Sequence, residues 1–226
     1  LLREKSGAGM VDCQKALAEA GGDIDKAMEI LRKKGIAKAA KRSGREAGEG
    51  VIKVALSGDT KTGYIFEINA ETDFVVRNEK FQNLAERVVK LIMKKQPKDL
   101  AELMALNIDG ITVKDSLDSL SGVIGEKLGI KKYDRLNSAG TVAVYSHLGG
   151  KIGVLAALDK EGQSDIAYEI AMQIAAANPK YIKPEEVAHE LNTYFDIDLQ
   201  KSNFIEIELK QKLFNGLKAD LDKIYN

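Results

Sequence analysis

One stretch, Gly63-Tyr-Ile-Phe-Glu-Ile-Asn-Ala70, predicts the central strand of this chain, and Thr72-Asp-Phe-Val75 follows it closely. The first run alternates in the way that is typical of a β-strand, and a helical pattern begins near Asn78. Residues 72–75 therefore join a strand to a helix, and such junctions lie at the surface because their backbone polar groups need water or a partner. There Phe74 either points outward to contact another molecule or turns inward to cap the core. The four residues alone favour neither orientation.

The length and composition of the chain indicate a folded protein. Its 226 residues suit one large domain or two to three small ones, and its hydrophobic content of 44% allows real cores. Acidic and basic residues balance at 34 each, which argues against a dedicated nucleic-acid or anionic-membrane protein. The single cysteine excludes an internal disulfide and fits a reducing compartment. No apolar run approaches the roughly 20 residues that span a bilayer, and no secretory signal is visible. The chain begins with Leu1 rather than methionine, so targeting is left open.

Residues 1–45 are predicted to form a small helical module followed by a basic linker. A first helix ends at Ser6-Gly-Ala-Gly9, and a second carries apolar side chains at spacings of three and four. Asp23 is a good N-cap for a third helix. About 40 residues bury only a small core, so this module should be marginal unless it leans on another part of the chain.

The stretch from Lys33 to Arg45 is rich in lysine and arginine and contains no acidic residue. One interpretation is a solvated helical linker, because charge runs are usually solvated. The other interpretation is an electrostatic contact with an acidic partner or with RNA phosphates.

The remaining chain is predicted to contain two related subdomains, at residues 46–136 and 137–226. In the first, strands at 51–56 and 64–70 precede helices at 78–95, 97–106 and 113–128. In the second, strands at 141–145 and 151–158 precede a helix at 164–177. In that helix Ile166, Ile170 and Ile174 form the apolar face. Only the first hairpin leads into an Asp73-Phe74 pair, which favours a functional role for this pair over a requirement of the fold.

The signal weakens after Pro184. Residues 185–195 and 210–225 are predicted as helices, and residues 204–209 alternate like a strand with one wet face. The predicted class is therefore α+β, with an N-terminal three-helix module followed by two hairpin-plus-helix subdomains with antiparallel sheets.

Motifs for nucleotide binding and metal catalysis do not occur in the chain. The sequence lacks a P-loop, a spaced G-x-G-x-x-G after a strand and an H-E-x-x-H. Its histidines, His147 and His189, lie in different predicted elements, and a zinc site would need three or four ligands. Cys13 lies on the apolar face of a predicted helix, where a small buried core residue is expected. We therefore predict a binding or regulatory protein that has no active site of its own, no metal and no cofactor.

Several stretches closely resemble the elongation factor Ts family. They are Leu2-Arg-Glu-Lys-Ser-Gly-Ala-Gly-Met-Val-Asp-Cys-Gln-Lys-Ala-Leu17, Gly22-Asp23, Glu71-Thr-Asp-Phe-Val75, Ile124-Gly-Glu-Lys127, Tyr145-Ser-His-Leu-Gly149 and Ile152-Gly-Val-Leu155. The resemblance runs in the family's order from residue 1 to about residue 187, and its first and third motifs are long and specific.

The resemblance implies a guanine-nucleotide exchange factor of the translational GTPase elongation factor Tu. Members of the family bind the GDP form, expel GDP and leave after GTP enters. Asp73 and Phe74 match the family residues that intrude near the magnesium site of the GTPase and wedge apart neighbouring helices. Thr72 and Val75 complete that motif.

The resemblance also implies further contacts with the GTPase. The opening module is similar to the family's ubiquitin-associated-like domain, which contacts the nucleotide-binding domain. His147 and Gly149 match a loop that approaches the phosphate-binding side, although Leu148-Gly-Gly150 departs from the commoner wording. The residues expected to bind the partner are Leu2, Arg3, Gly9, Met10, Val11, His147 and Gly149. A bacterial cytoplasmic location is implied, with an organelle as the alternative, and neither a membrane nor a direct nucleic-acid partner is expected.

The C-terminal part departs from the family pattern. Many bacterial members carry a long helical hairpin there, followed by a further strand. In this chain a shortened insertion near 185–203 and the strand-like run 204–209 are the candidates for these parts, and homodimerisation is left open.

Two other functions compete with the exchange factor. An adaptor would join a ubiquitin-associated-like module to an unrelated α+β domain, but it would not need residues 72–75. An RNA-associated protein would act through Lys33 to Arg45, and its affinity for RNA would fall steeply with salt.

Overall fold

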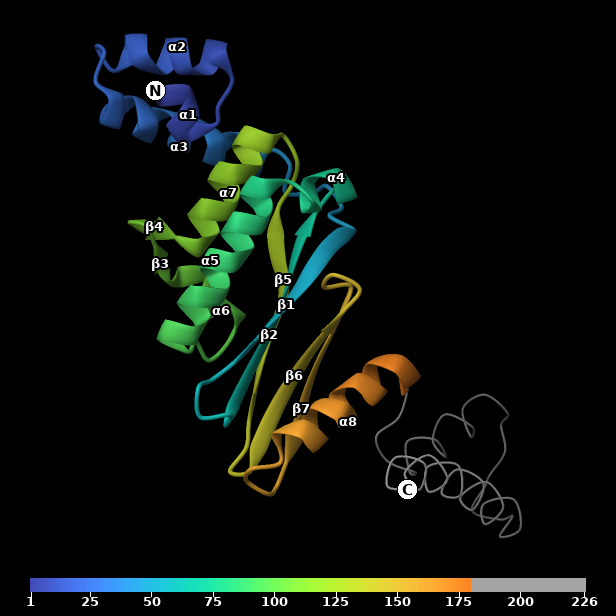
Figure 1. Cartoon of the computed structure of the whole chain (residues 1–226). Coiled ribbons are helices and arrows are strands. Elements are labelled where there is room, and N and C mark those ends of the chain that lie inside the picture. Colours follow the sequence, from blue (N-terminus) through green and yellow to red (C-terminus); the bar gives the residue numbers. More distant parts are fainter. Residues whose placement is uncertain (180–226) are drawn as a thin grey trace, which may run out of the picture. The chain divides into compact units, whose positions relative to one another are not determined.

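The computed structural model describes residues 1–179 and combines helices with antiparallel sheets (Figure 1). The predicted α+β class is therefore confirmed, and residues Leu1–Ala176 form one compact unit. Within residues 1–179, no helix is long and apolar enough to cross a bilayer. The predictions for 185–195, 204–209 and 210–225, the insertion near 185–203 and His189 lie outside the described residues. The boundaries 1–45, 46–136 and 137–226 stay predictions.

The chain begins with three helices, α1 (Leu2–Ser6), α2 (Met10–Glu19) and α3 (Ile24–Ala40). Asp23 caps α3 as predicted, because its Oδ1 accepts the backbone N–H groups of Asp25 at 2.9 Å and Lys26 at 3.0 Å. The core of these helices is small. Its buried side chains are Leu2, Ala8, Cys13, Ala16 and Ala27.

Helix α3 extends well beyond this core and packs on α7 (Val113–Ile124). The two helices meet at glycines, since a Cβ on Gly122 would lie 2.2 Å from the Cα of Gly35. The contact gives the N-terminal helices a second partner and explains how so small a core is supported. The basic stretch is therefore not a freely solvated linker, because its first half is a packed helix.

The main sheet has the strand order β1-β2-β5, with β1 at Glu49–Leu56, β2 at Thr62–Ala70 and β5 at Gly129–Asn137. Both pairings are antiparallel. Strand β5 was not predicted, because its lysines, aspartate and arginine hide the alternation that marks a strand. Pairing with β2 supplies what its local sequence lacks.

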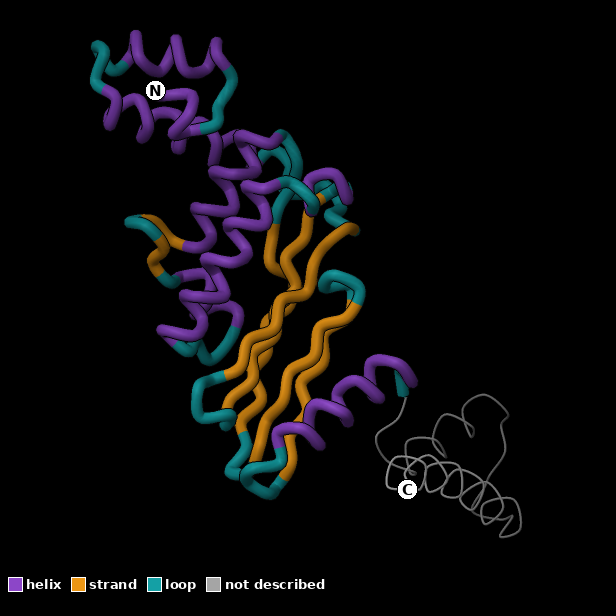
Figure 2. The backbone as a smooth tube through the Cα atoms, in the orientation of Figure 1, coloured by secondary structure: helices purple, strands orange, loops and turns teal. Residues whose placement is uncertain are grey.

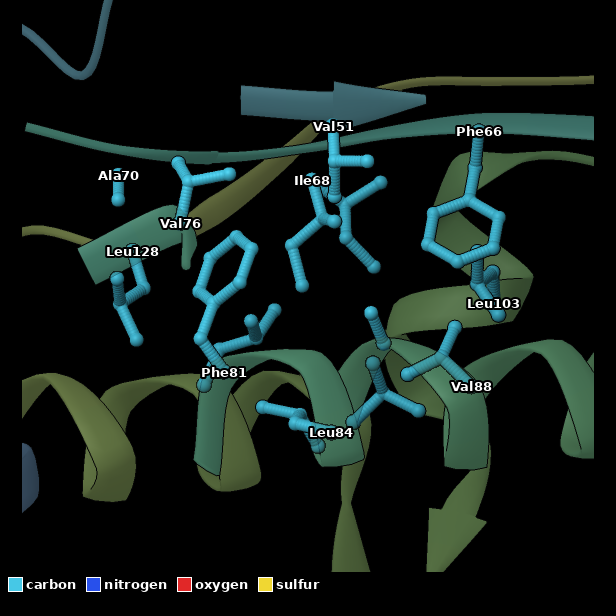
Figure 3. Close-up of a cluster of buried hydrophobic side chains, with 14 of the residues drawn as sticks. Val51, Phe66, Ile68, Ala70, Val76, Phe81, Leu84, Val88, Leu103 and Leu128 are labelled. Carbon is cyan, nitrogen blue, oxygen red and sulfur yellow. The ribbon is translucent and has the colours of Figure 1, made fainter. Parts of the chain in front are cut away.

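One face of this sheet is covered by helices (Figures 1 and 2). They are α5 (Glu79–Lys95), α6 (Leu100–Ala105) and α7. Alternate residues of β2, among them Phe66 and Ile68, point into the core beneath them and meet Phe81 and Val88 of α5 (Figure 3). Two short strands, β3 (Asn107–Ile108) and β4 (Ile111–Thr112), form a small hairpin before α7.

A second hairpin covers the other face of the sheet. Its strands are β6 (Thr141–His147) and β7 (Ile152–Leu158). Glycines make the close packing possible, because a Cβ on Gly63 would lie 2.9 Å from Val142 and a Cβ on Gly153 would lie 2.5 Å from Ile52. The predicted strand 63–70 is thus covered on both of its faces, although Ile65 and Glu67 on the hairpin side are only half-buried.

The last described helix, α8 (Ser164–Ala177), lies where it was predicted, and its buried face is shifted from the predicted one. Its fully buried side chains are Ala167, Ala171 and Ala175. Of the predicted apolar face, Ile166 and Ile170 are half-buried and Ile174 is 36% exposed. The helix contacts the hairpin through Tyr168, which meets Tyr145 of β6 edge to face with ring centroids 5.6 Å apart.

Candidate functional site: two exposed turns at one end of the sheet

The junction after β2 is a single helical turn, α4 (Asp73–Val76). Thr72 is its N-cap, with the hydroxyl oxygen 3.5 Å from the N–H of Val75. Val75 and Val76 are each only 8% exposed, and Val76 points into the core cluster beside Ala70 and Phe81 (Figure 3). Two adjacent inward side chains on one turn leave Phe74 on the opposite side, and it is 80% exposed. Of the two orientations that the sequence leaves open, Phe74 therefore adopts the outward one.

Asp73 lies beside Phe74 and pairs with Arg77 at the other end of the turn. The carboxylate and guanidinium are 2.9 Å apart; the Arg77 side chain is 78% exposed and the Asp73 side chain 42% exposed. Such a pair contributes on the order of 0–1 kcal/mol to stability. Asp73 can therefore exchange this partner for another at little energetic cost.

Hydrogen bonds tie the junction to the segment that follows α7. Glu126 accepts the Thr72 N–H at 3.0 Å and the Thr72 hydroxyl at 2.7 Å. Glu71 accepts the Lys127 N–H at 2.6 Å. This bond, together with the nearby Arg45, lowers the pKa of the Glu71 carboxyl below its ordinary value, although partial burial opposes the shift.

The second exposed turn connects β6 to β7 and contains His147 and Gly149. His147 is exposed, and its Nδ1 lies 2.9 Å from the Tyr145 hydroxyl, with the two rings stacked at 5.8 Å. Leu148 has φ 50° and Gly149 φ 65°, so the turn is left-handed at both positions. Leu148 is 69% exposed.

Both turns lie at the same end of the main sheet (Figure 1). Glu49 pairs with Ala70 in the β1–β2 register, so β1 begins where β2 leads into α4. At this end the Glu49 carboxylate also forms an ion pair with the Lys151 ammonium group of the second turn, at 3.1 Å. The Gly150 carbonyl accepts the Ile52 N–H at 2.6 Å. The structure thus places two groups of predicted site residues, 72–75 and 147–149, at the same end of the main sheet.

The predicted site residues of the N-terminal module differ in their exposure to solvent. Arg3, Gly9, Met10 and Val11 are exposed, with Met10 at 55% and Val11 at 60%. Leu2 is only 5% exposed and packs in the core of the three helices, so its side chain is not part of the exposed surface. Beside Met10 an open groove of about 640 Å³ extends to Lys80, on the first turn of α5.

Sequence reasoning did not assign Leu148, Glu71 or Glu126 to the site. The motif Ile124-Gly-Glu-Lys127 carries only a resemblance to the family. Its Glu126 binds Thr72 in the structure, but the two residues are 54 positions apart, and nothing in the sequence pattern indicates that they meet. Within residues 1–179, no group of three or more His, Cys, Asp and Glu side chains is arranged to hold a metal ion.

Exposed apolar side chains held on short, anchored turns are typical of a protein that contacts another protein. Comparison with known proteins gives the family. A family model described as elongation factor TS matches residues 71–212, and the chain therefore belongs to the elongation factor Ts family.

Individual relatives agree with this assignment. A protein named Elongation factor Ts from Clostridium perfringens strain SM101 is 46% identical over 195 residues, which cover 84% of this chain and 64% of the relative. One of the same name from a Nitratiruptor species is 44% identical over 84% of this chain and 65% of the relative. One from Clostridioides difficile strain 630 is 38% identical over 96% of this chain and 76% of the relative. The chain thus spans a little less than two thirds of the length of the first two relatives.

Proposed function

We propose that this chain is a guanine-nucleotide exchange factor that binds elongation factor Tu in its GDP form and promotes GDP release during translation elongation. The observation that carries the proposal is Phe74, 80% exposed beside Asp73 on an anchored turn, in a chain of the elongation factor Ts family. An exposed aromatic of this size needs a partner to cover it if it has a function, and aromatic anchors are common interface hot spots.

The proposed action of Asp73 and Phe74 is on the magnesium ion of the partner. Magnesium bridges nucleotide phosphate oxygens and protein oxygens, so weakening its coordination removes much of the electrostatic hold on GDP. Phe74 would insert between elements of the GTPase, and Asp73 would disturb the water-mediated ligands of the ion. Thr72 and Val75 would hold the turn, in keeping with the cap and the burial described above.

Exchange of this kind needs no bond chemistry in the factor, and we propose neither an active site nor a cofactor for it. It requires only that the factor and the nucleotide weaken each other's binding to the GTPase, and this coupling is reciprocal. GDP must therefore lower the affinity of the GTPase for this chain by the same factor by which the chain lowers its affinity for GDP.

Two further surfaces are proposed to bind the GTPase. His147 and Gly149 share the sheet end with Phe74 and would approach the phosphate-binding side. Arg3, Gly9, Met10 and Val11 belong to the three-helix module, which we propose to be ubiquitin-associated-like and to contact the nucleotide-binding domain.

The alternative functions are less well supported. In the basic stretch, Lys33, Lys34, Lys38 and Arg45 pair with Glu29, Glu19, Asp12 and Glu71 of the same chain. Their charges are thus partly balanced within the chain, which weakens the case for an RNA-binding patch. A simple adaptor gives no reason for an anchored turn that presents Phe74.

The test is release of fluorescently labelled GDP from elongation factor Tu after addition of excess unlabelled nucleotide. Addition of this chain in stoichiometric amounts should accelerate release, and the acceleration should shrink as free magnesium is raised, because the ion opposes the proposed displacement. Unchanged release at stoichiometric amounts would refute the proposal.

A further inference from the structure

Two segments far apart in sequence exchange hydrogen bonds at the base of α4. The Glu126 carboxylate accepts the N–H of Thr72 at 3.0 Å, and the Glu71 carboxylate accepts the N–H of Lys127 at 2.6 Å. Each segment thus provides a carboxylate for a backbone N–H of the other. We call these four residues, Glu71, Thr72, Glu126 and Lys127, the clasp. Hydrogen bonds to a charged acceptor are the stronger kind.

Within the clasp, Glu126 also controls the cap of α4. Its second oxygen lies 2.7 Å from the Thr72 hydroxyl. Because a carboxylate can only accept, the hydroxyl must donate its single proton to Glu126, and its lone pairs are then free to accept the Val75 N–H. Without Glu126 the hydroxyl can rotate and donate elsewhere. The carboxylate therefore stabilises the N-cap as well as the backbone of Thr72.

Glu126 is itself held in place by the end of α7. Gly125 has φ 94° and ends the helix, with its N–H donating to the Ser121 carbonyl at 2.9 Å. The Ser121 hydroxyl, which is buried, donates to the Glu126 carbonyl at 2.5 Å. Lys127 donates through Nζ to the carbonyls of Ser43 at 2.6 Å and Arg45 at 2.7 Å. The clasp is thus attached both to α7 and to the chain that follows α3.

We infer that Glu126 is a positioning residue for Phe74, acting through Thr72 to hold α4 in the conformation that presents the phenyl ring. The inference rests on the proposed function for what Phe74 does, but its effect on α4 belongs to the free chain and is measurable without a partner. A turn of only four residues, Asp73–Val76, has little stability of its own, so its cap and its two buried valines decide how often it is formed.

The first test is amide hydrogen exchange in the free chain. Glu126→Ala removes both bonds to Thr72 and should speed exchange of the Val76 and Arg77 amides by about tenfold or more. Amides of the paired strands β1 and β2 should keep their rates. The matched control is Glu161→Ala, which removes an exposed carboxylate paired with Lys61 at 2.6 Å, away from the clasp. Glu126→Gln keeps an acceptor for the Thr72 N–H and should restore part of the protection.

The second test separates positioning from direct action in the GDP-release assay. If α4 is formed in only a fraction of the molecules, the apparent affinity of the factor for the GTPase falls in proportion to that fraction. The factor that is bound still releases GDP at the normal rate. Glu126→Ala should therefore raise the concentration of factor that gives the half-maximal rate of GDP release by about tenfold. The maximal rate of release should stay near that of the unaltered chain. Phe74→Ala removes the acting group and should lower the maximal rate.

The outcomes distinguish this inference from the proposed function. Unchanged amide exchange in α4 of Glu126→Ala, or an acceleration spread equally over β1 and β2, would overturn the positioning role. Glu126→Gln keeps an acceptor for the Thr72 N–H but can no longer act as a pure acceptor toward the Thr72 hydroxyl, so it must loosen α4 by a smaller amount than Glu126→Ala. This milder variant keeps the test decisive if Glu126→Ala does not fold. If Phe74→Ala accelerates GDP release as much as the unaltered chain, the role proposed for Phe74 fails. If the unaltered chain itself does not accelerate GDP release, the proposed function fails. In both cases the amide-exchange result for Glu126 still stands.

Discussion

Truncation of Phe74 is the substitution that best separates function from folding in this protein. The ring is 80% exposed, so Phe74→Ala removes almost no buried surface and should change the unfolding free energy by less than about 0.5 kcal/mol. By contrast, Phe81 is fully buried in the same core that Val75 and Val76 enter. Phe81→Ala should destabilise the chain by about 3–5 kcal/mol.

The expected loss of function is large. An aromatic hot spot contributes at least about 2 kcal/mol to an interface, and this corresponds to roughly a thirtyfold fall in the second-order rate constant for GDP release. Phe74→Leu keeps an apolar side chain, so its rate constant for GDP release should lie between those of the unaltered chain and Phe74→Ala. Met172→Ala, which truncates an exposed apolar side chain on α8 outside the proposed site, is the control and should release GDP at the normal rate.

The measurements are urea unfolding for stability and labelled GDP release at several concentrations of the factor. A folded Phe74→Ala variant that releases GDP normally would refute the reasoning about the site. A variant that lost several kcal/mol of stability would contradict the outward orientation of the ring.

Two other predictions concern the supports of the site. Gly122→Ala places a methyl group 2.2 Å from the Cα of Gly35, so α3 and α7 must separate. We expect the unfolding free energy to fall by about 1–3 kcal/mol and the Tm in thermal unfolding to fall with it. An unchanged Tm would contradict the close contact between the two helices. The pKa of the Glu71 carboxyl is lowered from its ordinary value of 4.5 by the Lys127 N–H and by Arg45, so between the folded and unfolded pKa values the unfolded chain binds more protons. Its stabilising contribution is therefore complete above about pH 4.5 and is lost as the pH falls through the folded pKa. Glu71→Gln should make the unfolding free energy less dependent on pH in this acidic range, and an equal dependence in both proteins would argue against the Glu71–Lys127 bond.

Much of the secondary structure follows from local pattern. The alternation of residues 63–70, the cap at Asp23 and the apolar period of residues 79–95 each specify their element without help from the rest of the chain. The resemblance of residues 71–75 to the elongation factor Ts family likewise needs only the order of the residues, because a motif is a property of the chain and not of its packing.

Other features depend on residues that are distant in sequence. Strand β5 is too charged to alternate clearly and becomes a strand because β2 pairs with it. Helix α8 buries its alanines more completely than its isoleucines, and Leu2 lies in a core rather than on a surface. Local periodicity tells which side chains share a face, but only the neighbours decide which face is covered.

The orientation of Phe74 shows the same division. Sequence alone places an aromatic and a carboxylate in a junction between a strand and a helix, and there it leaves two orientations open. The tertiary structure decides between them, because Val75 and Val76 enter the core and Glu126, 54 residues from Thr72, binds this N-cap residue of the turn. The free energy that selects the outward ring comes from these contacts, which exist only when the chain is folded.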